Sequence, residues 1–87
     1  MNICVVFLNK PNAGCWQNVR DNWPNGHHFI LTDHMAFVAS ENITTTAEIS
    51  DKVGIGENGA LGIVFDLGAY NGYNRGELWE WINKVRS

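Results

Sequence analysis

Cysteine, proline and charged residues are scarce in this chain, which has two of each of the first two and only 17% charged residues. Cys4 and Cys15 have neither the CxxC spacing nor the density of a disulfide scaffold, so we expect two buried thiols. No apolar run approaches the roughly 20 residues of a membrane span, and no basic leader precedes the first one. We therefore expect a cytoplasmic protein without membrane contacts.

Basic residues are also few, and they are scattered. The six lysines and arginines stand singly along a chain whose formal net charge is −3. Proteins bind a phosphate backbone with clustered cations that release counterions, and this sequence has no such cluster. The charge pattern disfavours tight nucleic-acid binding by a monomer, although dimerisation can bring separate arginines together.

Hydrophobic residues are plentiful at 45% of the chain, and four Trp, four Phe and two Tyr supply large side chains for packing. A chain of 87 residues has the size of one domain with one core. We therefore expect a single domain over residues 1–87.

Four short apolar segments predict β-strands, and three segments with helical spacing predict helices. The strands are expected at residues 3–8, 28–31, 35–39 and 61–67, and the helices at 15–23, 45–53 and 74–86. Residues 3–8 are apolar throughout, which is typical of a central strand, and the short gap between 28–31 and 35–39 predicts an antiparallel hairpin.

The helix ends carry recognisable signals. Thr45 and Glu48 have the spacing of a capping box, and glycines follow Val53. Asn74 is a candidate N-cap for the last helix, whose apolar stripe includes Trp81. The whole order predicts an α+β fold of ferredoxin-like βαββαβ topology: a four-stranded antiparallel sheet with two helices on one face, plus a C-terminal helix.

The hairpin histidines are the only cluster of metal-competent side chains. His28 and His34 are cross-strand neighbours if the hairpin closes tightly, and Asp33 lies beside them. The alternative is an ordinary solvent-facing hairpin, because His27 and His28 point to opposite faces of a strand. Asp66 stands in an apolar strand, where it is either a buried carboxylate with a raised pKa or an exposed, ordinary residue.

Aromatic residues gather near the C-terminus. Trp81 belongs to the apolar stripe, whereas Trp79 lies off it and Tyr70 and Tyr73 fall in a glycine-rich link. These three residues form either an exposed interface or part of the core. The glycines at residues 54–59 lack the context of a phosphate-binding loop and indicate a connector.

Several segments together resemble a family: the turn at residues 7–11, the helix start at 45–49, the glycines and tyrosine of 68–73, and the helix residues 77–82. They are similar to small ferredoxin-fold proteins related to the CRISPR-associated metal-dependent nuclease and to virulence-associated interferase toxins. The resemblance implies a homodimer with a metal-binding acidic residue at the end of the first strand.

The chain departs from that family at the metal site. The matching position is Phe7, and no Asp or Glu precedes Asp21. A phenyl ring cannot hold a hard divalent cation, which needs oxygen ligands. The resemblance thus favours the fold and the homodimer and disfavours the nuclease activity.

Motifs of nucleophilic and zinc-dependent catalysis are missing, since the sequence contains neither Gly-x-Ser-x-Gly nor His-Glu-x-x-His. We therefore predict no catalytic residues, metal or cofactor, and a non-catalytic, dimer-forming domain that binds a protein partner of unknown identity. The alternative is a divalent-metal-dependent nuclease or toxin-like ribonuclease that uses Asp66, His28 and His34. A small-ligand binder is a third, weaker hypothesis.

Overall fold

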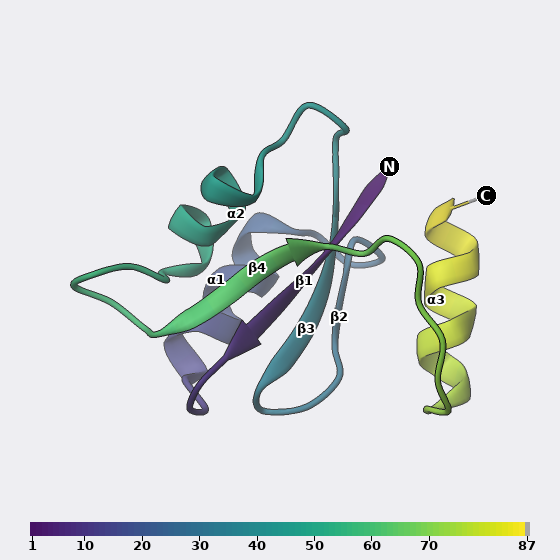
Figure 1. The fold of residues 1–87 in the computed structure, drawn as a ribbon, viewed down its shortest axis with the longest axis horizontal. Coiled ribbons are helices and arrows are strands. Elements are labelled where there is room, and N and C mark those ends of the chain that lie inside the picture. Colours follow the sequence, from purple (N-terminus) through teal and green to yellow (C-terminus); the bar gives the residue numbers. More distant parts are fainter. Residues whose placement is uncertain (87) are drawn as a thin grey trace.

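The computed structural model describes residues 1–86 and contains in them one four-stranded sheet and three helices (Figure 1). The strands are β1 (Asn2–Leu8), β2 (His28–Ile30), β3 (Met35–Ser40) and β4 (Gly62–Asp66), and the helices are α1 (Ala13–Asn22), α2 (Thr46–Val53) and α3 (Gly76–Arg86). The predicted α+β class and antiparallel four-stranded sheet are confirmed. None of the helices in these residues has the length and apolar character to span a membrane.

The sheet has the strand order β2-β3-β1-β4, with antiparallel pairing throughout. Each of the first two helices connects two strands that are separated by one strand: α1 joins β1 to β2, and α2 joins β3 to β4. The predicted central position of β1 and the hairpin of β2 with β3 are confirmed. At the other edge, β4 pairs with β1 alone.

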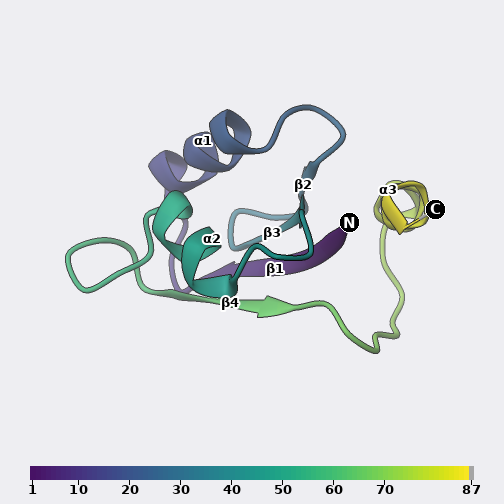
Figure 2. The ribbon, with the colours of Figure 1, turned by 90° about the horizontal axis from the view of Figure 1, so that it is seen from above.

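One face of the sheet is covered by α1 and α2, as Figure 2 shows. The cluster beneath them includes both cysteines, which are buried free thiols as predicted. The capping box is also confirmed, since the Thr45 hydroxyl accepts from the Glu48 N–H and the Glu48 carboxylate accepts from the Thr45 N–H. Gly54 ends α2 with a φ of 102°, a conformation that glycine adopts without strain.

The opposite face of the sheet carries α3, which lies away from α1 and α2 (Figures 1 and 2). Trp81 is the main contact, because its ring packs against Phe29 of β2 and Phe37 of β3 and its Nε1 donates to the Gly26 carbonyl at 2.9 Å. The apolar stripe that predicted this helix is thus confirmed as core. The helix begins at Gly76, one residue later than expected for an Asn74 cap, because Asn74 accepts from its neighbour Arg75.

Candidate functional site

Four large apolar side chains remain exposed on the α3 face of the sheet: Phe7 of β1, Ile63 and Phe65 of β4, and Leu61, which directly precedes β4. The exposed fractions are 37% for Phe7, 67% for Leu61, 60% for Ile63 and 46% for Phe65. Phe7 pairs with Ile63, and alternate residues of a strand share a face, so the four form one contiguous group. We call this group the β4 apolar surface.

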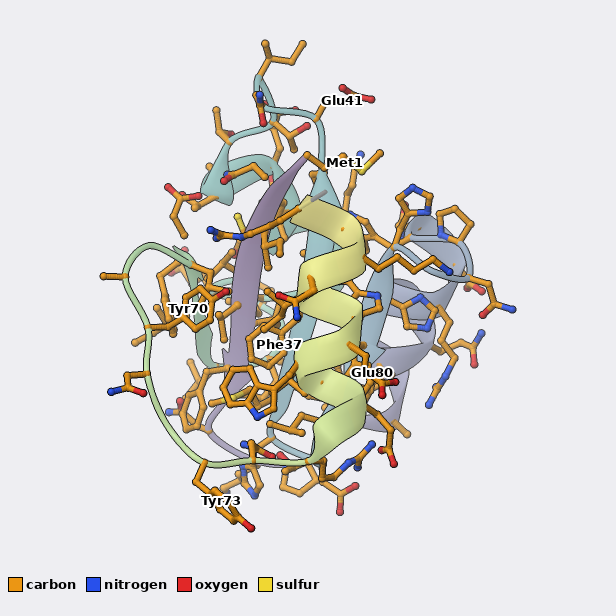
Figure 3. All side chains as sticks on the ribbon, turned by 90° about the vertical axis from the view of Figure 1, so that its right-hand side faces the viewer. Met1, Phe37, Glu41, Tyr70, Tyr73 and Glu80 are labelled. Carbon is orange, nitrogen blue, oxygen red and sulfur yellow. The ribbon has the colours of Figure 1, made fainter. Side chains whose placement is uncertain are left out.

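The position of α3 explains why this surface stays open. The helix packs over β2 and β3 through Trp81, whose neighbours Phe29 and Phe37 it covers. In Figure 3 the helix stands in front of these strands, and the link between β4 and α3 (residues 67–75) passes to one side of it. An 11-residue helix covers only part of a four-stranded sheet, and the strip at β4 lies beyond it.

The edge formed by β4 carries few of the side chains that usually protect an exposed strand. Natural edge strands are blunted by lysine, proline or inward-pointing charges. The only charged residue in β4 is Asp66, at its end, and the strand has no proline. An unprotected edge beside an apolar face is typical of a surface that another chain covers.

Asp66 is an exposed residue held by hydrogen bonds at the end of this strand. Its Oδ1 accepts from Asn2 Nδ2 at 2.8 Å and from the Cys4 thiol at 3.2 Å. The Asn2 bond and then the Cys4 bond lower the pKa of Asp66, so the hypothesis of a buried carboxylate with a raised pKa is wrong. Burial, with the bond and the charge of Asp66, raises the pKa of Cys4 to about 12.

Two of the hairpin histidines, His28 and His34, contact backbone carbonyls, whereas the buried Nδ1 of His27 has no hydrogen-bond partner in residues 1–86. His28 Nδ1 lies 2.6 Å from the Trp23 carbonyl, and His34 Nδ1 lies 3.0 Å from the Leu8 carbonyl. The expected cross-strand pairing of His28 with His34 is wrong, because His28 pairs with Val38 and His34 lies in the turn before β3. His34 stacks instead on the ring of Phe7, with the ring centroids 6.3 Å apart.

The candidate active-site residues do not converge. His28, Val38, Cys4 and Asp66 form one row across the four strands. Strands lie about 4.8 Å apart, so His28 and Asp66 are about 14 Å from each other. Residues 1–86 contain no group of three or more His, Cys, Asp or Glu that could hold a metal ion.

The three C-terminal aromatic candidates behave differently from one another. Tyr70 stacks on Trp79 with centroids 6.2 Å apart and an interplanar angle of 9°, and Arg86 lies over the Tyr70 ring. Tyr73 is fully exposed and projects from a different part of the link than Tyr70 (Figure 3). The structure therefore stacks Tyr70 on Trp79, whereas Tyr73 lines the same cavity as these two residues with its side chain exposed.

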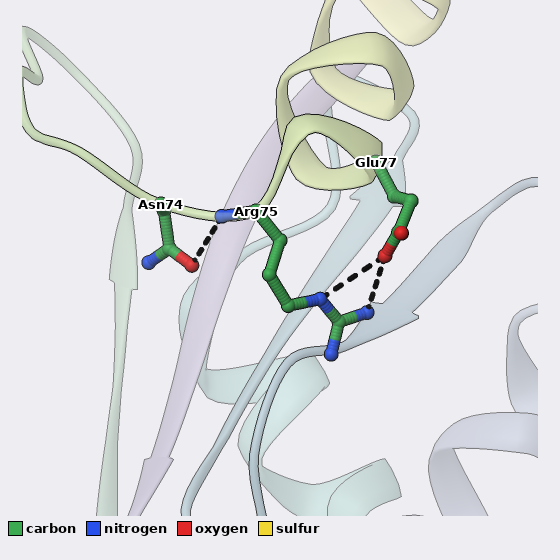
Figure 4. A network of polar contacts seen from close by, with 3 residues as sticks. All are labelled: Asn74, Arg75 and Glu77. Atoms are coloured by element: carbon green, nitrogen blue, oxygen red, sulfur yellow. Dashed lines mark hydrogen bonds and ion pairs between the residues drawn. The ribbon is translucent and has the colours of Figure 1, made fainter.

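The link reaches α3 through a small polar network, shown in Figure 4. Asn74 Oδ1 accepts from the Arg75 N–H at 2.8 Å, and the Arg75 guanidinium pairs with Glu77 at 3.0 Å and lies over the Phe29 ring. Between link, sheet and helix is a cavity of about 190 Å³, partly lined by Tyr70. Ligand pockets usually exceed about 300 Å³, so this space is too small for an ordinary ligand site.

Sequence reasoning missed the β4 apolar surface. The segment at residues 61–67 is apolar at alternate positions, which predicts a strand but does not show whether its apolar face is covered. Phe7 was expected to matter only as a missing metal ligand. The sequence matches no protein-family model, no curated protein and no solved structure.

Proposed function

We propose that this chain is a non-catalytic, dimer-forming domain that works through protein contacts, with the β4 apolar surface as its interface. The observation that carries the proposal is the contiguous exposure of four large apolar side chains beside an unprotected edge strand. Exposed apolar patches of this kind mark protein-interaction sites. The surface lies beside the C-terminal link rather than on it.

The size of the surface supports a dimer that is modest in strength. Taking roughly 200 Å² for a fully exposed large side chain, the four side chains expose about 400 Å². Two copies contribute about 800 Å², against roughly 1,200 to 2,000 Å² for a standard interface. The edge backbone and neighbouring residues such as Leu67 have to supply the rest, so we expect a dimer near the lower size limit that dissociates on dilution.

The ferredoxin-like topology and the nuclease-related family remain part of this proposal. The topology is supported by the order of elements and by α1 and α2 sharing one face of the sheet. Phe7, at the position of the family's acidic residue, stacks on His34 and lies in the β4 apolar surface. An apolar ring there suits a protein contact and does not suit a divalent cation.

Sedimentation velocity tests the proposal over protein concentrations from about 1 to 500 μM, a range that spans typical weak-dimer affinities. We expect the wild-type protein to shift from monomer to dimer, and the variant carrying both Ile63→Lys and Phe65→Lys to stay monomeric. Lysine needs hydration of its charge, so it opposes burial at these two positions. Ile63 is 60% and Phe65 46% exposed, so lysine can reach solvent at both positions and the fold should survive, which circular dichroism checks.

Tyr73→Lys is the matched control. Tyr73 is as exposed as any residue of the surface but lies outside it, so its replacement should leave the dimer intact. Loss of the dimer in Tyr73→Lys with retention in the double variant would move the interface to the C-terminal link. A wild-type protein that is monomeric throughout the range would overturn the proposal.

A further inference from the structure

We infer that the occupant of the β4 edge is β4 of a second copy, paired antiparallel about a two-fold axis at Val64 to form one continuous eight-stranded sheet. This inference rests on the proposed function and adds the identity of the partner strand and its register. Packing of two apolar faces against each other, without strand pairing, is the competing geometry.

The backbone of β4 shows which groups are free for such pairing. Hydrogen bonds run from Asn9 N to the Leu61 carbonyl at 3.0 Å and from Leu67 N to the Ile3 carbonyl at 2.9 Å. Bonding alternates along an antiparallel strand, so residues 61, 63 and 65 direct their N–H and C=O groups toward β1, as Leu67 does with its N–H. The Leu67 carbonyl accepts instead from Arg86 Nη2 at 2.7 Å. Gly62, Val64 and Asp66 direct theirs to the open edge, where no strand of residues 1–86 pairs with them.

A two-fold axis at Val64 gives all of these outward-directed N–H and C=O groups a hydrogen-bond partner. It places Val64 opposite its own copy and Gly62 opposite Asp66, so the whole of β4 is paired. A shift of the axis by one residue in either direction leaves an outward-directed residue at one end of the strand without a partner. The central register therefore satisfies the most backbone groups.

The same register aligns the apolar side chains. Ile63 lies opposite Phe65 of the second copy, and Leu61 lies opposite Leu67. These are pairs without direct hydrogen bonds, in which Cα atoms are about 4.5 Å apart and side chains make their closest contacts. Ile63, Phe65, Leu61 and Leu67 thus form an apolar ladder of side-by-side contacts across the interface, while Phe7 on β1 lies one strand away from it.

Charge is also compatible with this arrangement. Asp66 faces Gly62 of the second copy, so the two carboxylates are not placed opposite each other. Asp66 also keeps its bonds to Asn2 and Cys4, because these lie on the strand's other neighbour, β1. Strand pairing therefore leaves both bonds of Asp66 intact.

Proline at position 64 tests the strand pairing. The Val64 N–H points to the open edge, so Val64→Pro removes a donor from the interface and no bond to β1. We expect Val64→Pro to fold, as judged by circular dichroism, and to be monomeric by sedimentation velocity at concentrations where wild type is dimeric. Val64→Ala, which keeps the N–H, is the matched control and should still dimerise.

Cysteine pairing tests the register independently, in case the proline variant does not fold. When Ile63→Cys and Phe65→Cys proteins are mixed and oxidised, we expect mainly the mixed covalent dimer, which intact mass spectrometry separates from the two like dimers. Residue 63 lies opposite residue 65 of the second copy, with Cα atoms about 4.5 Å apart. Residue 63 lies diagonally from its own copy, as residue 65 does, at about 7 to 8 Å, which is beyond disulfide reach.

The outcomes separate the two proposals. A folded Val64→Pro protein that remains dimeric, or like dimers formed as readily as the mixed one, would overturn the strand pairing and leave the proposed function standing. A wild-type monomer at every concentration would overturn both.

Discussion

Replacement of Trp81 by alanine tests the attachment of α3 to the sheet. Trp81 is 9% exposed, packs against Phe29 and Phe37, and donates to the Gly26 carbonyl. Truncation of a buried Trp costs about 3 to 5 kcal/mol, which is a large part of the roughly 5 to 15 kcal/mol that stabilises a typical domain. We expect Trp81→Ala to lower the free energy of unfolding by about that amount.

Urea denaturation followed by far-ultraviolet circular dichroism measures this change. Trp81→Phe keeps an aromatic ring against its neighbours but lacks the hydrogen bond, which contributes about 1 kcal/mol. We therefore expect Trp81→Phe to lower the free energy of unfolding by less than Trp81→Ala does. Tyr73→Ala is the exposed control and should stay within about 0.5 kcal/mol of wild type. A loss below about 1 kcal/mol in Trp81→Ala would refute the packing of α3 against the sheet.

Three further predictions concern local interactions. Thr45→Ala removes the capping box of α2 and should lower the free energy of unfolding by about 1 kcal/mol, measured by urea denaturation. The pKa of Asp66 is below its ordinary value of 3.8, so its stabilising effect is present above that pH and is lost as pH falls through the folded-state pKa. The stability difference between wild type and Asp66→Asn should therefore shrink when thermal unfolding is measured at progressively lower pH. A difference that does not change with pH would contradict the claim that hydrogen bonds lower the pKa of Asp66. The pKa of Cys4 is about 12, so iodoacetamide at pH 8 should leave this thiol unmodified in the folded protein and modify it after unfolding, as mass spectrometry can show.

Local signals in the sequence predicted the elements whose ends are determined by neighbouring residues. The second helix is the clearest case, because Thr45 and Glu48 satisfy each other's backbone N–H groups and Gly54 adopts the left-handed conformation that ends it. The apolar run of β1 likewise indicated a central strand. The start of α3 was missed by one residue, since Asn74 bonds to the adjacent Arg75 instead of capping the first turn.

Features that depend on tertiary placement were not readable from the sequence. Periodicity identified the apolar stripe of α3 but not the strands that it covers, so it could not show that Ile63 and Phe65 stay exposed. The histidines were misplaced for a similar reason, because adjacency along a hairpin does not fix register. His28 and His34 each contact a carbonyl from a different part of the chain.

Amide hydrogen exchange at Val64 tests the central claim most directly. In the monomer the Val64 N–H points to the open edge and should exchange quickly, whereas the N–H groups of Ile63 and Phe65 are bonded to β1 and should be protected. We predict that protection of Val64 rises with protein concentration in step with the dimer fraction, while Ile63 and Phe65 serve as internal references. Fast exchange of Val64 at concentrations where the protein is dimeric would contradict the account.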